Sequence, residues 1–331
     1  MMENVKIIAG SSSLSLAHKI CKHLDTELVD VTINKFANGE IRVLLNEQVR
    51  NSNIFIVQTG SHNNNNSSIN DILIETLFLI DASKKSDAKT VNLICPNYFY
   101  ARMDKKTDGR CCISASFIAS MLENAGLNRI ICVDLHNPSI QGFFQKIPCD
   151  NLFCLNLMYK YLQDNYFEDD YKEKFVLISP DVGCAPLIKK ASSKMGLPFL
   201  LCNKTRDYTK NNVVDEVQVI GNQQKYLEGR IALILDDMAD TCGTIKAVID
   251  ALKEKGAKEV IVMISHGIFS GPAIDRINNN SNLSKIICSN SIEQSLNLEK
   301  SDKLEVFDIS ELLFSVIDSL INGKSISRLF Y

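Results

Sequence analysis

IALILDDMADTCGTIKAVIDAL, residues 231–252, is the stretch that decides the fold. A continuous apolar run ends in two adjacent carboxylates, Asp236 and Asp237, and a short polar loop leads into an amphipathic helical pattern. An apolar run without alternation predicts a strand buried on both faces, as in a parallel sheet covered by helices. Ligands of such sheets bind beyond the carboxyl ends of the strands, so we expect the chemistry of this protein at that turn.

The same order of strand, turn and helix recurs along all 331 residues. Helical patterns lie between several of the strands, for example at 113–126 and 243–257. The segment 28–47 alternates and contains Asn38-Gly39, which predicts a projecting β-hairpin. This alternation predicts an α/β fold with two similar halves, each a mainly parallel sheet flanked by helices, joined near 163–174. The apolar runs predicted as strands cover 5–10, 53–60, 90–96, 129–136, 174–181, 198–204, 231–237, 259–267 and 303–310.

The composition indicates a globular protein and excludes several classes. A net charge of −3 provides no whole-chain basic field that would favour nucleic acid. The N-terminus has no apolar signal core, and no apolar run approaches the ~18 residues of a membrane span. The eleven cysteines are odd in number, include no Cys-x-x-Cys pair and lie mostly inside apolar runs. We therefore expect reduced thiols and a cytoplasmic location.

The loop after the acidic pair has the composition of a sugar-phosphate site. Its small, polar or acidic residues are Asp240, Thr241, Cys242, Gly243 and Thr244. Backbone N–H groups at the start of the next helix can bind a phosphate monoester together with the two threonine hydroxyls. Asp236 and Asp237 would repel that phosphate, but a vicinal diol can donate hydrogen bonds to them. An ordinary helix cap explains the threonines but leaves the acidic pair unexplained. The pattern predicts ribose 5-phosphate as the ligand.

DDMADTCGT is similar to the phosphoribosyl-pyrophosphate-binding signature shared by phosphoribosyltransferases and phosphoribosyl pyrophosphate synthetases. Other stretches resemble the synthetases, also called ribose-phosphate pyrophosphokinases, and extend the resemblance over nearly the whole chain. These stretches are FANGE (36–40), YARMDKK (100–106), DLHNPSIQGFF (134–144), SPDVG (179–183), SHGIFSGPAIDRI (265–277) and GKSISRLF (323–330). The resemblance implies phosphoribosyltransferase-like domains at 1–155 and 156–315, and a C-terminal segment, 316–331, that packs on the first domain.

The resemblance also implies a reaction. The β,γ-diphosphoryl group of ATP would pass to the 1-hydroxyl of ribose 5-phosphate, giving phosphoribosyl pyrophosphate and AMP with Mg²⁺ as cofactor. The residues that match the ATP side of the family are Phe36, Asn38, Gly39, Glu40, Arg102, Met103, Lys105 and Lys106. Met103 stands where the family usually has glutamine. Taken alone, these residues also fit a solvated basic turn and ordinary hairpin chemistry.

Carboxylates after other strands are candidates for the metal. Alternation within the strand predicted at 129–136 would place Asp134 and His136 on one side, facing one cation. By resemblance, His136 is metal-associated and Asp181 is a second carboxylate on the metal or ribose side. Asp150 is a further candidate. Oxygen ligands and substrate phosphates suit Mg²⁺ better than zinc.

Two cations follow the strand predicted at 198–204. Lys204 and Arg206 lie two apart on an extended segment, so they share a face and can stabilise developing charge together. They match the catalytic lysine and its partner arginine in the family. The polar stretch after them, 207–218, is expected to be a mobile loop that closes over ATP.

The chain departs from the family pattern at Cys184, where glycine is usual, and at Pro186 and Leu187, where basic residues are common. A catalytically silent regulatory relative of the synthetase therefore stays open, as does a phosphoribosyltransferase. A phosphate- and ADP-responsive interface site of the family is matched by Arg50, Arg110, Ser325 and Ser327, although Pro138 replaces one of its serines. The resemblance further implies a homo-oligomer, with dimers assembling into a hexamer, that binds ATP and ribose 5-phosphate and neither nucleic acid nor membrane.

Overall fold

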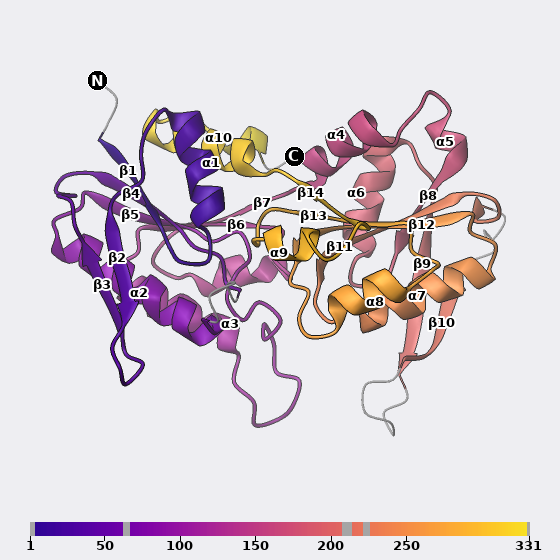
Figure 1. Cartoon of the computed structure of the whole chain (residues 1–331), viewed down its shortest axis with the longest axis horizontal. Coiled ribbons are helices and arrows are strands. Elements are labelled where there is room, and N and C mark those ends of the chain that lie inside the picture. The colour runs from indigo at the N-terminus through magenta and orange to yellow at the C-terminus, as the bar shows by residue number, and fades with distance from the viewer. Residues whose placement is uncertain (1–3, 62–66, 207–213, 221–225, 330–331) are drawn as a thin grey trace. The chain divides into compact units, whose positions relative to one another are not determined.

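The computed structural model describes residues 4–61, 67–206, 214–220 and 226–329, with backbone alone at 203–206 and 214–220. The chain divides into two compact units (Figure 1). The first unit comprises Met1–Cys154, Asn290–Glu293 and Asp308–Tyr331, and the second comprises Leu155–Ser289 and Gln294–Phe307. The domain borders drawn from the sequence, 155/156 and 315/316, stay predictions.

The first unit is built on a five-stranded parallel sheet in the order β1-β4-β5-β6-β7. Helices α1 and α10 cover one face, and α2 and α3 cover the other (Figure 1). The strands are β1 (Val5–Ala9), β4 (Asn53–Val57), β5 (Thr90–Ile94), β6 (Arg129–Val133) and β7 (Cys149–Leu152). The helices are α1 (Leu14–Leu24), α2 (Ile69–Lys85), α3 (Ser114–Asn124) and α10 (Ser310–Ile321), with short 3₁₀ turns at Pro138–Phe143 and Ser327–Leu329.

The apolar runs of the sequence explain why this sheet forms. All five residues of β4 are buried, as a strand covered on both faces requires. Helix α2 begins where the Ser68 hydroxyl accepts from the Asp71 N–H and the Asp71 carboxylate accepts from the Ser68 N–H, which is a capping box. The strand β7, sequence CDNL, was not predicted because its two polar residues interrupt the apolar pattern.

The predicted hairpin is present as β2 (Val31–Lys35) paired antiparallel with β3 (Ile41–Leu45). Its inward residues, including Ile33 and Val43, pack against the core of the first unit. An ion pair of 3.1 Å between Lys35 and Asp71 joins the hairpin to α2. The hairpin strands are therefore anchored up to Lys35, and residues 36–40 at the tip are exposed.

The second unit is built on a seven-stranded sheet in the order β10-β9-β8-β11-β12-β13-β14, of which only β10 is antiparallel to its neighbour. The strands are β8 (Phe175–Ser179), β9 (Phe199–Arg206), β10 (Val214–Ile220), β11 (Ile231–Ala239), β12 (Glu259–Gly267), β13 (Lys285–Ser289) and β14 (Leu304–Phe307). The helices are α4 (Leu155–Asn165), α5 (Tyr171–Lys174), α6 (Ala185–Met195), α7 (Gly243–Glu254), α8 (Ala273–Asn279) and α9 (Ser295–Leu298).

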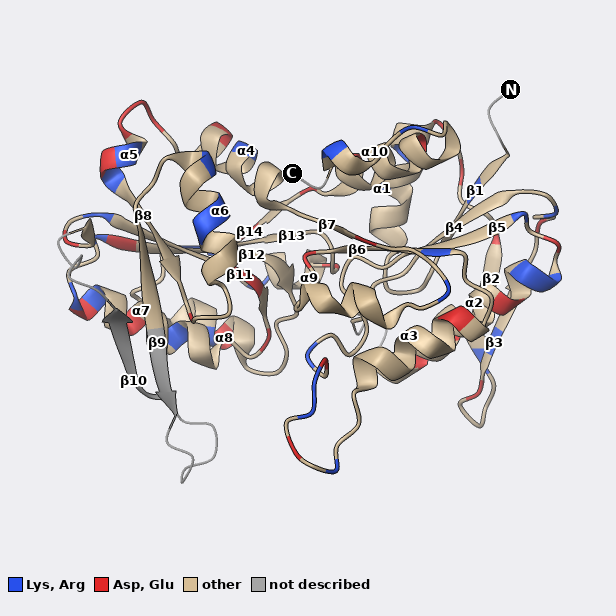
Figure 2. Cartoon of the chain, turned by 180° about the vertical axis from the view of Figure 1, so that it is seen from behind, with Lys and Arg blue, Asp and Glu red and all other residues tan. Residues whose placement is uncertain are grey.

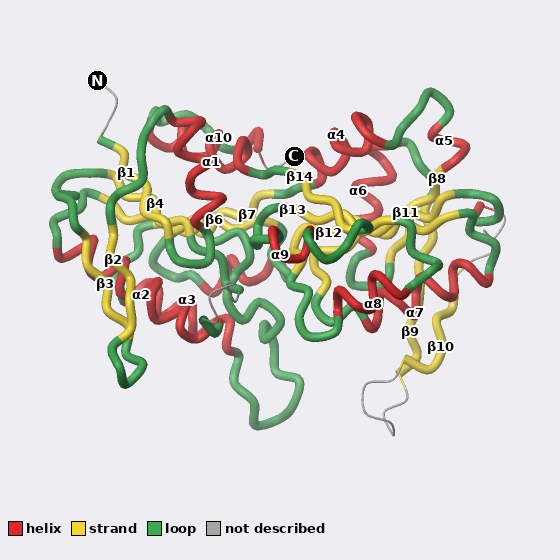
Figure 3. The backbone as a smooth tube through the Cα atoms, viewed as in Figure 1, coloured by secondary structure: helices red, strands yellow, loops and turns green. Residues whose placement is uncertain are grey.

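Helices lie on both faces of this sheet too, with α4 and α6 on one side and α7 and α8 on the other (Figure 3). The α/β class expected from the sequence is confirmed in both units. The sequence did not predict β10: residues 214–218 were expected to belong to a mobile loop, but they lie in this strand. It also did not predict β13, whose apolar run is too short to distinguish from a turn of helix.

The order of the strands in the second unit places the site. Strand β8 lies between β9 and β11, so the chain leaves β8 toward one side of the sheet and later returns on the other. Such a reversal leaves a crevice at the carboxyl ends of the two central strands, where ligands of open α/β sheets bind. We therefore expect a ligand at the turn after β8 and the end of β11.

Among the helices of the described segments, none combines the length and apolarity needed to cross a bilayer. No disulfide joins any of the eleven cysteines.

Candidate functional site

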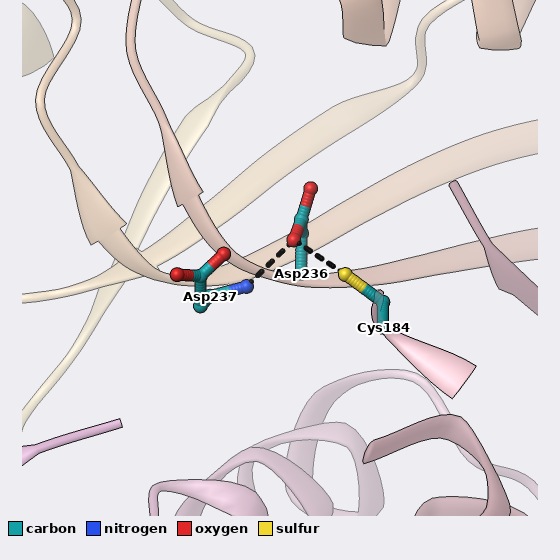
Figure 4. A group of neighbouring side chains, drawn as sticks. All are labelled: Cys184, Asp236 and Asp237. Atoms are coloured by element: carbon teal, nitrogen blue, oxygen red, sulfur yellow. Dashed lines mark hydrogen bonds between the residues drawn. The ribbon is translucent and has the colours of Figure 1, made fainter. Parts of the chain in front are cut away.

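The reversal point of the second sheet brings together three side chains that can bind metal or hydrogen-bond a ligand. Asp236 and Asp237 lie within β11, and Cys184 directly precedes α6 after the turn that follows β8. One ligand atom from each of the three lies within 4.8 Å of the others (Figure 4). The acidic pair that the sequence singled out is thus at the carboxyl end of a central strand.

The carboxylate of Asp236 is held from two sides. Its Oδ1 accepts hydrogen bonds from the Cys184 thiol and from the Asp237 backbone N–H, each at 2.9 Å. Figure 4 shows both bonds meeting at one oxygen, while the other oxygen of Asp236 points away from both donors. This second oxygen is the one placed to accept from a ligand.

Burial dominates the electrostatics of the acidic pair. Burial first, and the adjacent Asp237 carboxylate second, raise the pKa of Asp236 to about 7. Burial and the neighbouring Asp236 charge also raise the pKa of the Cys184 thiol far above its ordinary value. The thiol therefore stays protonated at neutral pH and can act as a hydrogen-bond donor. Hydroxyl donors or a cation at this position would relieve the repulsion between the two carboxylates.

The loop from Asp240 to Thr244 leads through a left-handed residue into the start of α7. Cys242 has a φ of 58°, in the left-handed region, and Gly243 is the first residue of α7. The first N–H groups of a helix have no partner within the helix and carry the positive end of its dipole. A turn of this shape followed by a helix start offers several N–H groups to one phosphate.

Arg276, on α8, contacts the predicted phosphate loop and was not singled out from the sequence. Its Nη1 donates to the carbonyl of Thr241 at 2.7 Å and so brings a positive charge to the phosphate loop. A Cβ at position 243 would stand 3.3 Å from this nitrogen, so glycine allows the close approach. Arg276 lies inside the stretch 265–277 that carried the family resemblance, but only the packing of α8 shows what it contacts.

Asp181 lies in the turn between β8 and α6, next to the same group. Its Oδ1 accepts from the Cys184 N–H at 3.1 Å, and its carbonyl accepts from the Ser179 hydroxyl at 2.6 Å. One of its carboxylate oxygens therefore orders the start of α6. The turn is fixed around Cys184, the residue that touches Asp236.

In the first unit, the alternation argument for Asp134 and His136 is wrong. Strand β6 ends at Val133, and Asp134 has a φ of 39°, so the strand periodicity does not continue to His136. The Asp134 carboxylate accepts from the Cys154 N–H at 3.0 Å, and His136 is exposed. Metal binding by these two residues stays a prediction that rests on the resemblance.

Asp150 has a structural partner. It lies on β7 and forms an ion pair and hydrogen bond with Arg129 of the neighbouring strand β6. Within the described side chains, the group of Cys184, Asp236 and Asp237 is where three metal-binding side chains meet, and Asp150 is not part of it.

The structure connects two stretches of the first unit that the sequence treated separately. The Asn137 amide donates to the Asp104 carboxylate at 2.5 Å, which ties the basic segment at 100–110 to the turn after β6. Lys105 and Lys106 are exposed in this segment, and Figure 2 shows blue Lys and Arg positions along the loop that precedes α3. Arg102 is also exposed, and Met103 is half-buried, its carbonyl accepting from the N–H of Ala115 at 3.2 Å. Asp104 and Asn137 were not among the predicted site residues.

The hairpin tip has both the turn chemistry and the exposure that the sequence suggested. The side-chain amide oxygen of Asn38 accepts from the Glu40 N–H at 3.2 Å, and Gly39 has a φ of 92°. Phe36 is 55% exposed, which leaves an aromatic ring open to a planar ligand. The Asn38 side chain thus supports the turn itself, whereas the Phe36 ring is mostly exposed.

The predicted catalytic pair is described by its backbone alone. Lys204 and Arg206 lie on β9, opposite Val217 and Val214 of β10. Their side chains, and residues 207–213 of the predicted mobile loop, lie outside the described part of the chain. Positions two apart on a strand share a face, so the backbone is compatible with joint action.

The four residues matched to a phosphate and ADP site all belong to the first unit. Arg50 pairs with Asp87 at 3.1 Å, and both side chains are largely exposed. Arg110 is exposed, and the Ser325 hydroxyl donates to that of Ser327 at 3.1 Å.

Comparison with known proteins gives consistent results. A family model described as the N-terminal domain of ribose phosphate pyrophosphokinase matches residues 5–126, and one described as a phosphoribosyl synthetase-associated domain matches residues 210–331. The ribose-phosphate pyrophosphokinase of Fusobacterium nucleatum is 37% identical over 99% of this chain and 98% of that protein. Ribose-phosphate pyrophosphokinase 4 of Saccharomyces cerevisiae is 38% identical over 99% of this chain and 95% of that protein.

A solved structure agrees with these relatives. The crystal structure of phosphoribosylpyrophosphate synthetase from Mycobacterium smegmatis superposes with a TM-score of 0.86 at 34% identity. The match covers 97% of this chain and all of that one. Both units of the fold described above are therefore included in the likeness.

Proposed function

Because the chain belongs to the ribose-phosphate pyrophosphokinase family, we propose that the carboxyl edge of its second sheet binds ribose 5-phosphate for attack on ATP. The chain is an enzyme that forms phosphoribosyl pyrophosphate and AMP from these two substrates. The 1-hydroxyl attacks the β-phosphorus in line and AMP leaves. The observation that carries the assignment is the acidic pair beside a phosphate-binding helix start.

Each part of ribose 5-phosphate has a matching group in the second unit. Asp236 and Asp237 accept hydrogen bonds from the ribose diol, through the Asp236 oxygen left open by Cys184 and Asp237 N–H. The 5-phosphate lies at the loop from Asp240 to Thr244, where Arg276 adds positive charge. Charge of opposite sign at the two ends fixes the direction in which the sugar binds.

ATP is assigned to the first unit. Arg102, Lys105 and Lys106 neutralise polyphosphate oxygens, and the link from Asp104 to Asn137 holds their segment in place. Phe36 stacks on adenine, while Asn38, Gly39 and Glu40 form the turn that presents it, with Met103 packing on the purine. Lys204 and Arg206 stabilise the transferring group, which they can do from one face of a strand.

The family uses a divalent metal ion, which we propose is Mg²⁺. The carboxylate oxygens of Asp236 and Asp237 fit a hard cation, and this close pair needs positive charge. Asp181, which accepts from the Cys184 N–H in the neighbouring turn, is a further oxygen donor. In the first unit Asp134 and His136 are the residues that would hold it, while the pairing of Asp150 with Arg129 makes Asp150 the weakest donor. When bound, the ion neutralises charge on the phosphoryl oxygens.

Assembly, regulation and location belong to the same proposal. The exposed Phe36 at a hairpin tip supports a homo-oligomer in which the tip serves a neighbouring subunit, as in dimers that assemble into a hexamer. Arg50, Arg110, Ser325 and Ser327 are the candidates for binding a regulatory phosphate or ADP. A cytoplasmic location agrees with cysteines that form no disulfide.

A magnesium-dependent assay with ATP and ribose 5-phosphate tests the function directly. Chromatography of the nucleotides should show AMP formed one-to-one with phosphoribosyl pyrophosphate, and no ADP. The Asp237→Asn variant should raise the KM for ribose 5-phosphate much more than the KM for ATP. Formation of ADP, or an equal rise in both KM values, would reject the assignment.

A further inference from the structure

Cys184 is the one thiol that contacts the acidic pair in the described part of the chain, and the reaction gives it no role. We infer that Cys184 is a positioning residue for the ribose site: its thiol holds one oxygen of Asp236 so that the other oxygen is presented to the ribose hydroxyls. This inference rests on the proposed placement of ribose 5-phosphate. It assigns to Cys184 an effect on sugar affinity and none on the chemical step.

The geometry of Asp236 supports this role. A carboxylate can rotate about its last bond, and it adopts one orientation only when donors fix one of its oxygens. Here both the Cys184 thiol and the Asp237 N–H donate to the same Oδ1, each at 2.9 Å. The Asp237 N–H belongs to the same strand and would remain in any variant. The thiol is the donor that arrives from another element.

The thiol is itself held in place. The N–H of Cys184 donates to the Asp181 carboxylate at 3.1 Å, and the Ser179 hydroxyl donates to the Asp181 carbonyl at 2.6 Å. Helix α6 starts at the next residue, with a proline in its first turn. A fixed turn therefore connects the end of β8 to the carboxylate on β11. Because the carboxylate is already ordered, less conformational entropy is lost when a ligand binds.

A different role for the thiol predicts the opposite change in affinity for the sugar. A thiol beside the acidic pair could occupy space that ribose hydroxyls need, so that its removal would tighten binding. The distance of 2.9 Å and the meeting of both bonds at one oxygen favour the supporting role, because the second oxygen points away from the thiol (Figure 4). The two possibilities predict changes of KM in opposite directions.

Three single variants of the full chain decide between them. Cys184→Ala removes the donor, and the KM for ribose 5-phosphate should rise about fivefold, as expected for one weak donor to a charged acceptor. The kcat at saturating sugar and the KM for ATP should stay within about twofold. Cys184→Ser keeps a donor and should restore most of the affinity. Cys288→Ala, which removes a buried thiol from β13 of the same sheet, is the matched control and should leave both KM values unchanged.

A double-mutant cycle with Asp236→Asn asks whether Cys184 acts through that carboxylate. Calorimetric titration with ribose 5-phosphate should show weaker binding by Asp236→Asn, and Cys184→Ala should add less than about twofold in that background. If Asp236→Asn binds the sugar as the natural chain does, the placement of ribose fails. If Asp236→Asn weakens binding but Cys184→Ala lowers KM, leaves it unchanged, or keeps its full effect in the double variant, the positioning role of Cys184 is overturned.

Discussion

Replacing Asp236 by asparagine should make the protein more stable at pH 8 while weakening its binding of ribose 5-phosphate. Asparagine keeps the shape of the side chain, and its carbonyl oxygen can still accept from the Cys184 thiol and the Asp237 N–H. The substitution removes a negative charge that is destabilised by burial and by the neighbouring Asp237 carboxylate. The carboxylate that we assign to the ribose therefore destabilises the folded chain at this pH.

The magnitude follows from the raised pKa. Asp236 has a pKa of about 7 in the folded chain against the ordinary 3.8, so the native state holds its proton more tightly than the unfolded chain does. Stability is therefore lost as pH rises from about 4 to about 7, and the loss is complete above that range. At 1.36 kcal/mol per pKa unit, the upper limit is about 4 kcal/mol at pH 8 and under about 2 kcal/mol at pH 5.

Thermal unfolding in EDTA, followed by circular dichroism at pH 8 and pH 5, measures this effect. A gain of about 2 kcal/mol corresponds to a rise in Tm of about 4–8 °C for a unit of this size. The rise for Asp236→Asn should be clearly larger at pH 8 than at pH 5. The matched control is Asp250→Asn on α7, because hydrogen bonds from Lys246 and Asn282 outweigh burial and lower the pKa of Asp250. That variant should lose stability at pH 8.

An equal change of Tm at both pH values would refute the reasoning, since it would mean that the proton of Asp236 is not linked to folding. A fall in Tm at pH 8 would show that the carboxylate stabilises the native state. In the assay with Mg²⁺, Asp236→Asn should raise the KM for ribose 5-phosphate by about tenfold or more, as expected for lost hydrogen bonds to a charged group.

Three further predictions concern other parts of the molecule. Lys204→Ala should lower kcat by about 10²–10³ with an unchanged Tm, measured by AMP release, and an unchanged kcat would remove Lys204 from catalysis. Arg276→Ala should raise the KM for ribose 5-phosphate about tenfold, because the hydrogen bond to the Thr241 carbonyl and the positive charge are lost. Arg276→Lys should recover part of the affinity. A KM of Arg276→Ala equal to that of the natural chain would show that the loop does not need Arg276. Burial alone would raise the pKa of Asp308, but hydrogen bonds from Lys19, Ser310 and Asn290 lower it to about 2. Asp308→Asn should therefore lower the free energy of unfolding, measured in urea at pH 7, by about 1 kcal/mol, because solvent screens part of the interaction of this half-exposed carboxylate. The difference in stability between the variant and the natural chain should vanish as pH falls from about 4 to about 2. A difference that persists below pH 2 would contradict this.

The sequence determined the parts of this protein that depend on local pattern. Continuous apolar runs predicted β4 and β11, and alternation around Asn38-Gly39 predicted the hairpin, because strand burial and turn chemistry act over a few neighbouring residues. The acidic pair and the loop to Thr244 were identified for the same reason. Strands with mixed or short apolar runs, such as β7, gave no such signal.

The end of a strand is less well determined than its centre. The strand predicted at 129–136 extends beyond β6, because the backbone leaves the extended conformation at Asp134. There the Asp134 carboxylate accepts from the Cys154 N–H, a bond to a residue 20 positions later in the chain. Periodicity within the strand could not reveal that partner, so alternation gives no argument for a common orientation of Asp134 and His136.

Only the tertiary structure decided which residues from distant positions act together. Cys184 and Asp236 are 52 positions apart, and Thr241 and Arg276 are 35 apart, yet each pair is in hydrogen-bond contact. These contacts exist because β8 and β11 are neighbours in the sheet and α8 packs beside the loop that follows β11. The sequence specified which groups are available for the proposed sugar site, whereas strand order specified which of them are in contact. Strand order depends on packing summed over the whole unit, and no single stretch of sequence contains it.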